Sequence, residues 1–363
     1  MSQKINVLVV EDSPVAQMLL VHILNSDPRL NVSGTASDGE EALALLQRHK
    51  PDVIVMDIHM RGLDGYETTR RIMETQPVPV VVCSASLDPA EVATTFRALE
   101  AGALALVAKP VGPGHENYES AAAKLVETVA LMSEVKVVKR WVRARRPEGS
   151  NAVLPPMEGR QGGVPVKVIA VGVSTGGPPV LQTILQGLSR DFPAPVLIVQ
   201  HIAAGFLQGL GDWLTATTKF PVSIATHGET PLPGHAYLAP DGHHMALGAN
   251  GRIALNQQDP ENGLRPAVSH LFRSVAAFHG AAAVGVLLTG MGRDGADELK
   301  CLKDLGAITL AQDAESSAVH GMPGEAIKLG AVTYVLAPDK IAAVLTGLVA
   351  DRSREPWPRP DRK

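Results

Sequence analysis

The sequence predicts an α/β protein with two doubly wound, mainly parallel-sheet domains, a five-stranded one followed by a larger one. Short apolar runs alternate with segments whose apolar residues recur at helical spacing. This alternation occurs twice, on either side of a Pro- and Gly-rich stretch. Strands that alternate with helices form parallel sheets covered on both faces. A chain of 363 residues, with 45% hydrophobic and 19% charged residues, is large enough for two such cores.

The first domain is predicted over residues 1–134. Its strands are expected at 5–10, 31–36, 53–56, 78–83 and 103–108. Each is followed by a helical pattern, the last from 116 to about 141. Residues 135–165 are predicted as the end of that helix and a linker, because Pro and Gly replace apolar residues there. The short basic cluster at 143–146 is interpreted as solvated linker rather than a docking patch.

The second domain is predicted over residues 166–350. Its strands are expected at 166–173, 195–200, 222–226, 236–239, 282–288, 307–311 and 331–335. Helical segments follow several of these strands, so this sheet too is expected to be doubly wound. The charged, Pro-containing tail 351–363 is predicted to be disordered.

Composition excludes several classes of protein. The formal net charge of −4 gives no sign of a basic nucleic-acid-binding face. No run approaches the roughly 18 apolar residues of a membrane span, and the first apolar run is too short and too early for a secretory signal. We therefore expect a cytoplasmic protein without membrane insertion. Cys83 and Cys301, in apolar surroundings, are predicted to be buried structural thiols in a reducing compartment.

Reactive side chains follow four strands of the first domain. They are Glu11, Asp12, Asp57, Ser84 and Lys109. Because the carboxyl ends of parallel strands meet at one edge of a sheet, these groups should converge. Carboxylates suit Mg²⁺, and Asp57 could attack phosphorus to form an acyl phosphate, with Lys109 and Ser84 contacting its oxygens. Each residue alone has a simpler explanation, such as helix capping by Asp12, but the joint pattern favours a phosphorylation pocket.

The segments VLVVEDSP, VIVMDIHMRGLDGYE, VVVCSAS and GALALVAKP resemble the response-regulator receiver family across residues 1–130. The resemblance implies that Asp57 is the phosphoacceptor and that Glu11, Asp12, Asp57 and the carbonyl of His59 bind Mg²⁺. It also implies a cis Lys109–Pro110 bond. Leu106 stands where the family commonly has an aromatic switch residue, which puts aromatic-switch coupling in question.

A serine lies at a glycine-rich turn in the second domain. Gly172-Val-Ser174-Thr-Gly176 follows a strand, precedes a helix and fits the G-x-S-x-G form of a nucleophile elbow. A phosphate-binding glycine loop is the alternative. That fingerprint requires G-x-G-x-x-G, and here Ser174 takes the place of the middle glycine. This segment alone leaves both interpretations open.

A serine nucleophile needs a base and a group that orients the base. His201 ends the next strand, and Asp294 follows the strand 282–288, so both should lie at the same sheet edge as Ser174. Asp241 and Asp313 are reserve candidates for the orienting carboxylate. For the other histidines we expect surface or structural roles: His227, His235, His243, His244, His270, His279 and His320. No Glu or Cys spacing around His243-His244 supports a metal site.

The segments GVSTGGP, VQHIAAGF, LPGHAYLAPDGHH, LLTGMGRDGA and AQDAESSAVHGMPGEA resemble the CheB-type chemoreceptor glutamate methylesterase domain, which is Rossmann-like. The resemblance implies Ser174 as nucleophile, His201 as base and Asp294 as its orienter. It places the backbone of Met291 and Thr175 at the oxyanion. Arg265 could contact an acidic substrate or pair locally, and the two readings weigh equally.

The resemblance further implies the substrate and partners. The substrate would be a γ-glutamyl methyl ester on the cytoplasmic helices of a chemoreceptor, with methanol released and no cofactor needed for the esterase reaction. Some family members also deamidate receptor glutamines. A CheA-type histidine kinase would donate the phosphoryl group. The family often has RPSVD where this chain has Arg265-Pro-Ala-Val-Ser269, a departure at a likely receptor-contact surface. The rival interpretations are a catalytically silent receiver-regulated adaptor and, more weakly, a nucleotide-binding regulator.

Overall fold

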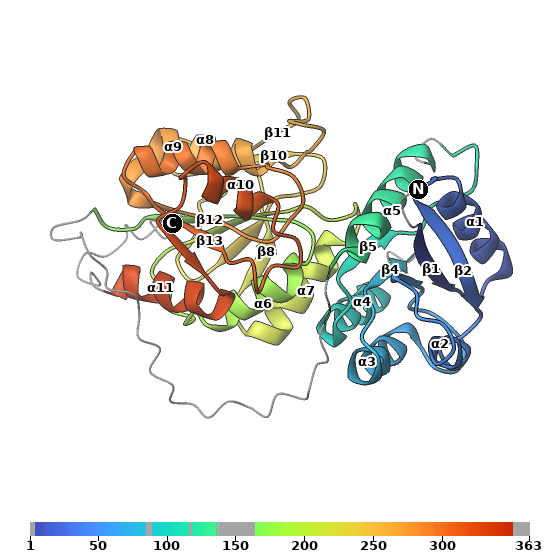
Figure 1. The fold of residues 1–363 in the computed structure, drawn as a ribbon. Helices are drawn as coiled ribbons and strands as arrows, with labels where there is room; N and C mark the ends of the chain where they lie inside the picture. Colours follow the sequence, from blue (N-terminus) through green and yellow to red (C-terminus); the bar gives the residue numbers. More distant parts are fainter. Residues whose placement is uncertain (1–3, 85–88, 116–117, 136, 138–163, 351–363) are drawn as a thin grey trace. The chain divides into compact units, whose positions relative to one another are not determined.

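The computed structural model describes residues 4–84, 89–115, 118–135, 137 and 164–350. The chain splits into two compact units, each built on its own parallel sheet. The α/β class predicted from the sequence is confirmed (Figure 1). The predicted linker, apart from its two ends, and the predicted tail 351–363 lie outside the described residues.

The first unit has a five-stranded parallel sheet with the order β2-β1-β3-β4-β5. The strands are β1 (Ile5–Val10), β2 (Leu30–Ala36), β3 (Val53–Met56), β4 (Val80–Ser84) and β5 (Ala105–Ala108). The helices are α1 (Pro14–Asn25), α2 (Gly39–Leu46), α3 (Gly65–Thr75), α4 (Pro89–Ala101) and α5 (Tyr118–Ser133). The strand order reverses between β1 and β3, so the crevice at their carboxyl ends is the expected place for a site.

Side-chain caps define the start of three helices in this unit. Ser13 accepts a hydrogen bond from the Ala16 N–H and so caps α1. Asp38 and Asp64 cap α2 and α3 in the same way. Such caps satisfy backbone donors that the first helical turn leaves unpaired. Because Ser13 caps α1, the capping role considered for Asp12 is not the one it has.

The last helix of this unit is shorter than predicted. α5 ends at Ser133, not near residue 141. The N–H groups of Glu134 and Val135 bond to the carbonyls of Leu131 and Met132, three residues back, which closes the final turn. The next residues are rich in valine, and β-branched side chains favour helices less than alanine or leucine does.

The second unit has a seven-stranded parallel sheet with the order β14-β13-β12-β6-β7-β9-β8. The strands are β6 (Val168–Val173), β7 (Val196–Gln200), β8 (Val222–Ile224), β9 (Ala236–Leu238), β12 (Ala283–Leu287), β13 (Ile308–Gln312) and β14 (Tyr334–Leu336). The order reverses around β6, which lies between β12 and β7. β14 begins three residues later than predicted: the Ala331 N–H closes the turn after α10 by bonding to the Ala326 carbonyl, whereas the Thr333 N–H already bonds to the Thr309 carbonyl of β13.

Helices cover both faces of this sheet (Figure 1). They are α6 (Gly177–Gln186), α7 (Leu207–Thr218), α8 (Val268–His279), α9 (Ala296–Asp304), α10 (Met322–Lys328) and α11 (Pro338–Ala350). A hairpin of β10 (His244–Leu247) and β11 (Ile253–Asn256), which the sequence did not predict, packs on α8. Its Met245 and Leu247 join Leu271 and Phe272 of α8 in one buried cluster.

The two cysteines differ in exposure. Cys83 on β4 is fully buried, as predicted, but Cys301 is exposed, so the prediction for Cys301 was wrong. α9 buries Ala296, Leu299 and Leu302, and Cys301 lies outside that buried set.

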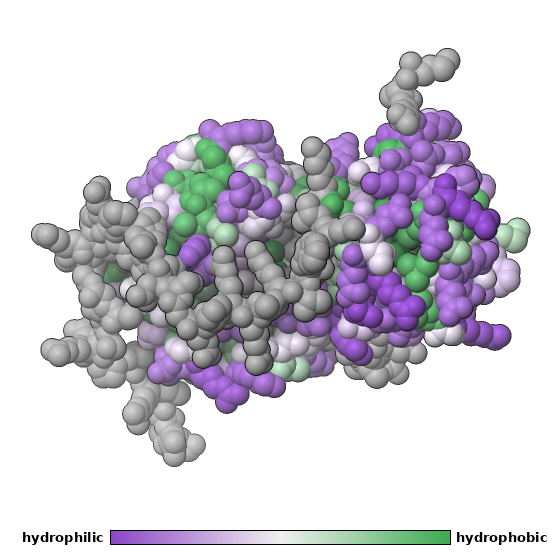
Figure 2. Space-filling view, turned by 60° about the horizontal axis from the view of Figure 1, so that its bottom comes forward, coloured by the Kyte–Doolittle hydropathy of each residue, from purple (hydrophilic) through white to green (hydrophobic). Residues whose placement is uncertain are grey.

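The molecular face in Figure 2 is mainly hydrophilic, with smaller hydrophobic areas. Within the described residues, no helix has the length and apolarity needed to span a membrane.

Candidate functional site

Acidic side chains from two neighbouring strands meet in the first unit. Glu11 and Asp12 follow β1, and Asp57 follows β3. Their carboxylates each offer an oxygen, and these oxygens lie within 4.8 Å of one another. Glu11 is 1% exposed and Asp57 is 5% exposed, so two of the three charges are removed from water. Burying like charges together is costly unless a cation offsets them.

Lys109, at the end of β5, supplies part of that positive charge. Its Nζ lies 2.7 Å from Glu11 Oε2 and 3.1 Å from Asp57 Oδ2. Burial would lower the pKa of Lys109, but the charges and hydrogen bonds of Asp57 and Glu11 outweigh it and raise the pKa. Burial raises the pKa of Glu11, and the charge of Asp57 adds to the rise, although Lys109 opposes it.

The pocket also holds an unused hydroxyl. Ser84 ends β4 beside β5, and its buried Oγ has no hydrogen-bond partner within the part of the chain that the structure describes. An orphaned buried hydroxyl near a lysine suits an incoming phosphoryl oxygen. The three carboxylates are the oxygen ligands that Mg²⁺ prefers. His59 lies two residues after Asp57, beyond the same strand.

The structure also describes the Lys109–Pro110 peptide bond and the surroundings of Leu106. The Lys109–Pro110 bond is trans, contrary to expectation, and the cis peptide bond among the described residues is Arg265–Pro266. Leu106 on β5 is partly buried and pairs with Val82 of β4, so an aliphatic side chain occupies the place of an aromatic switch.

Three predicted catalytic residues converge in the second unit. β6 and β7 pair in parallel with Val173 opposite Gln200, so Ser174 and His201 follow adjacent strands at the same edge. The His201 N–H donates to the carbonyl of Val173, and the Ser174 N–H donates to the carbonyl of Thr289, beyond β12. This edge is the reversal point of the strand order, where α/β folds bind ligands.

Asp294 lies against the imidazole of His201. Its Oδ2 is 3.1 Å from His201 Nε2, and the carboxylate is 4% exposed. The same carboxylate accepts hydrogen bonds from the N–H groups of Val268 (2.7 Å) and Ser269 (2.9 Å). These are the first residues of α8, whose N-cap, Ala267, offers no side-chain cap. Asp294 therefore caps this helix from a distant segment.

Hydrogen bonds join the α8 start and the Asp294 segment in both directions. Ser269 Oγ accepts a hydrogen bond from the Gly295 N–H at 3.0 Å. Burial would raise the pKa of Asp294, but the hydrogen bond and charge of His201, together with the bonds from Ser269, lower it overall. A carboxylate held at a helix N-terminus stays ionised and keeps one orientation.

Further residues, which the sequence analysis did not single out, hold the nucleophile loop. Gln200 Nε2 donates to the carbonyls of Ser174 (2.9 Å) and His201 (2.8 Å). Thr289 Oγ1 donates to the carbonyl of Thr175 at 2.9 Å. Gln312 Oε1 accepts from the Thr289 N–H. Gln200 and Gln312 end parallel strands, and Thr289 lies two residues past the end of β12. These strand-end positions were the signal in the sequence that could have identified the three residues.

The loop leaves backbone donors available near the serine. Gly176 has φ of +76°, a conformation that glycine adopts without strain, and it turns the chain from β6 into α6. Among the described residues, the N–H groups of Thr175 and Met291 have no backbone or side-chain acceptor. Met291 is 41% exposed. These two donors are the predicted oxyanion contacts.

The other candidates lie elsewhere. Asp313 accepts from the N–H and Oγ of Ser316, in a local turn. Arg265 donates to the carbonyls of Gln257 and Gln258, as in the local-pairing interpretation. It does not begin a helix, since α8 starts at Val268.

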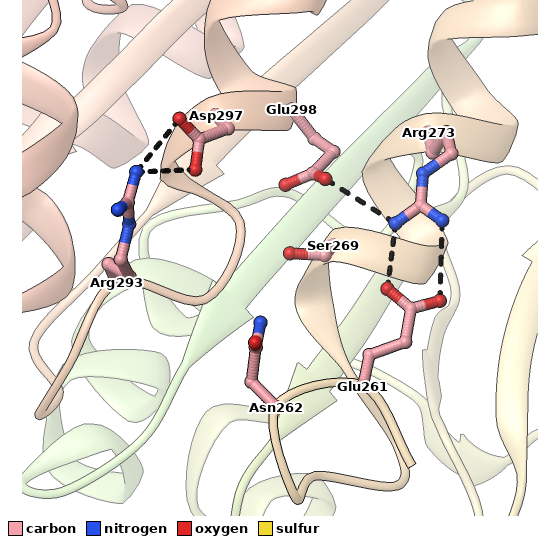
Figure 3. Close-up of a pocket in the computed structure, with 7 residues that line it drawn as sticks. All are labelled: Glu261, Asn262, Ser269, Arg273, Arg293, Asp297 and Glu298. Carbon is pink, nitrogen blue, oxygen red and sulfur yellow. Dashed lines mark hydrogen bonds and ion pairs between the residues drawn. The ribbon is translucent and has the colours of Figure 1, made fainter. Parts of the chain in front are cut away.

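A polar cavity of about 480 Å³ lies next to the Asp294 segment. Its lining consists of Glu261, Asn262, Ser269, Arg273, Arg293, Asp297 and Glu298. Figure 3 shows that its charges are paired within the wall: Arg273 with Glu261 and Glu298, and Arg293 with Asp297. The arginines that line the cavity are therefore already paired with carboxylates of its own wall.

Comparison with known proteins gives concordant similarities for both units. Residues 7–116 match the family model described as response regulator receiver domain, and residues 169–345 match CheB methylesterase. A protein-glutamate methylesterase/protein-glutamine glutaminase of Nitrosospira multiformis is 57% identical over 96% of this chain and 98% of its own length. A relative of the same name from Geobacter metallireducens is 54% identical over 96% of this chain and 100% of its own.

The second unit is also similar to a solved structure. The crystal structure of the Thermotoga maritima CheB methylesterase catalytic domain is 38% identical, with a TM-score of 0.50. The match covers 51% of this chain and 100% of the Thermotoga chain.

Proposed function

We propose a mechanism from the premise that this chain belongs to the protein-glutamate methylesterase/protein-glutamine glutaminase family, with a receiver domain before a CheB methylesterase domain. The chain hydrolyses glutamate γ-methyl esters of chemoreceptors under the control of phosphorylation. The observation that carries the mechanism is the contact of Asp294 with His201 at the strand-order reversal that also presents Ser174.

The acylation step uses Ser174 and His201. His201 Nε2 lies 3.1 Å from Asp294 Oδ2, and in the proposed mechanism Nε2 carries the proton and Nδ1 is the free base. As Ser174 Oγ bonds to the ester carbonyl carbon, Nδ1 takes the hydroxyl proton. The carbon–methoxy bond then breaks, and the methoxy oxygen takes that proton and leaves as methanol. Asp294 stabilises the imidazolium that forms between the two events.

The oxyanion and the second half-reaction involve the same groups. The N–H groups of Thr175 and Met291 would donate to the oxygen of the tetrahedral intermediate. Water attacks the acyl-enzyme while His201 takes its proton, which releases the glutamate carboxylate and restores Ser174. With a glutamine side chain, the same steps would release ammonia in place of methanol.

The receiver pocket would control this chemistry through Asp57. Asp57 accepts the phosphoryl group, and Lys109 and Ser84 bind its oxygens. Glu11, Asp12 and Asp57 would hold Mg²⁺ through their carboxylates, together with the carbonyl of His59. The ion, when bound, supplies positive charge that offsets the phosphoryl group. Support for this arrangement comes from the clustered carboxylates and the orphaned Ser84 hydroxyl.

The receiver would span residues 1–134, the helix end and linker 135–165 and the catalytic domain 166–350. The chain would act in the cytoplasm on the cytoplasmic helices of a chemoreceptor, with a CheA-type histidine kinase as phosphodonor. Arg265 would contact the substrate only by giving up its bonds to the Gln257 and Gln258 carbonyls.

Methanol release from a methylated receptor tests the function. Purified full-length protein should release methanol, and a small-molecule phosphodonor with Mg²⁺ should increase the rate. Ser174→Ala should lower kcat by roughly four to six powers of ten. A near-normal rate in Ser174→Ala would overturn the nucleophile assignment.

The rival is a silent adaptor that keeps the hydrolase fold without the reaction. A serine-directed covalent probe separates the two. Labelling of the wild type at Ser174, with none in Ser174→Ala, supports the enzyme. Unlabelled wild-type protein that still binds receptor would support the adaptor.

A further inference from the structure

His244 is a fully buried histidine outside the proposed catalytic triad. It lies on β10, in the hairpin that stands apart from the seven-stranded sheet. We infer that His244 is a positioning residue for the triad, acting on Asp294 through the first turn of α8. This inference rests on the proposed function, because it assigns a role in the same reaction.

Hydrogen bonds fix one neutral form of the His244 ring. The backbone N–H of Ala267 donates to Nδ1 at 3.3 Å, so Nδ1 carries a lone pair. Nε2 lies 3.1 Å from the carbonyl oxygen of Asp259, which only accepts, so Nε2 carries the proton. Both ring nitrogens are therefore used, and neither remains for a substrate.

Ala267 connects this ring to the catalytic carboxylate. It is the N-cap residue of α8, and the next two N–H groups, from Val268 and Ser269, donate to Asp294. Three successive backbone donors at one helix start are thus divided between His244 and Asp294. A helix start leaves such donors unpaired unless other groups accept them. His244 takes the donor that Asp294 does not, and so holds the turn that aims Asp294 at His201.

A second histidine holds the first in place. His270 on α8 stacks on His244, with ring centroids 4.6 Å apart and planes 23° from parallel. Asn256 Nδ2 lies 3.1 Å from His270 Nε2, and His270 Nδ1 lies 2.9 Å from Glu261 Oε1. Glu261 is also paired with Arg273, at 2.7 Å. The ring stack therefore ties the hairpin to the same helix that carries Ser269.

A metal site is the competing explanation for this cluster. His244, Glu261 and His270 offer ligand atoms within 4.8 Å of one another, a grouping of residues far apart in sequence. However, nearly parallel stacked rings direct their in-plane lone pairs side by side rather than toward one ion. All four ring nitrogens also already have hydrogen-bond partners. The geometry favours positioning over metal binding.

Variants of the full-length protein test the inference. Asn places an amide oxygen near the position of His Nδ1, so His244→Asn keeps an acceptor for the Ala267 N–H, whereas His244→Leu removes it. We expect His244→Leu to lower kcat by roughly 10²-fold through misplacement of Asp294, with KM within about threefold of the wild type. His244→Asn should recover at least about tenfold of that loss. Methanol release from methylated receptor is the measurement.

A matched control separates positioning from loss of stability. Leu247→Ala removes a buried side chain from the same hairpin, while the Leu247 N–H keeps its bond to Ser274. Assayed well below its Tm, Leu247→Ala should keep a near-normal kcat. Equal kcat losses in Leu247→Ala and His244→Leu, or no recovery in His244→Asn, would overturn the inference.

Calorimetric titration with Zn²⁺ tests the metal alternative, and binding that His244→Leu abolishes would also overturn the inference. A wild-type protein that releases no methanol would instead refute the proposed function.

Discussion

Asp294 accepts a hydrogen bond at 2.9 Å from the backbone N–H of Ser269, 25 residues earlier in the chain. Ser269 in turn accepts one from the Gly295 N–H through its Oγ. This reciprocal pair fixes the carboxylate that faces His201 and joins the α8 start to the segment after β12.

We expect Asp294→Asn to lower kcat by about four powers of ten, with little change in KM. The Asn amide would turn an N–H toward at least one of the donors on Val268, Ser269 or His201, and the imidazole would lose its orientation. Methanol release from methylated receptor measures this. Asp297→Asn, at an exposed position on α9, is the control and should keep near-normal activity. Equal activity of Asp294→Asn and the control would contradict the assignment.

The lowered pKa of Asp294 also predicts a pH dependence of stability. A carboxyl whose folded pKa lies below its unfolded value stabilises the fold fully above the unfolded pKa, about 3.9. That stabilisation is lost as the pH falls through the folded pKa. The difference in Tm between wild type and Asp294→Asn should therefore shrink below about pH 4. A difference that grows with acidity would contradict the lowered pKa.

Gly290 should tolerate no side chain, because a Cβ there would lie 2.6 Å from Ser174 Cβ and 2.4 Å from Met322 Sδ. We expect Gly290→Ala to displace Ser174 and to lower kcat by roughly 10²-fold. Gly211→Ala, on helix α7, is the control: its Cβ would meet only Leu238, at 3.6 Å. It should keep kcat and a Tm at or above that of the wild type. Full activity of Gly290→Ala would show that the loop is not tightly packed.

Asp57→Ala should abolish stimulation by a small-molecule phosphodonor with Mg²⁺, since no other carboxylate follows β3 directly. We expect the wild type to respond by roughly fivefold or more. Glu40→Gln, at an exposed position on α2, should respond like the wild type. Methanol release with and without phosphodonor is the measurement. An equal response in Asp57→Ala would place the phosphoacceptor elsewhere.

The two thiols should react differently in the native protein. Burial raises the pKa of Cys83 to about 12, whereas Cys301 is exposed on α9. A chromogenic thiol reagent should therefore modify Cys301 quickly and Cys83 only after unfolding. Cys301→Ser should remove the fast phase. A fast phase that survives in Cys301→Ser would mean that β4 opens readily.

The sequence predicted the strand-end residues because their positions follow from local patterns. Apolar runs locate parallel strands, and the carboxyl ends of such strands share one sheet edge. Asp57, Lys109, Ser174 and His201 could be placed in this way. The strands of the β10–β11 hairpin were not predicted, because each has only four residues, which is too few for the alternation of apolar residues to distinguish a strand from a loop.

Other features depended on contacts between distant segments. Thr289 donates a hydrogen bond to the carbonyl of Thr175, 114 residues away. Asp294 caps α8, whose own N-cap residue offers no side-chain cap. His244 and His270 come together only because the hairpin packs on α8. The sequence by itself determined the two sheets and the residues at their edges, because these arise from local periodicity. Only the tertiary structure decided which carboxylate faces His201 and what holds it there, because the unpaired N–H groups at a helix start donate to whichever acceptor the packing brings next to them.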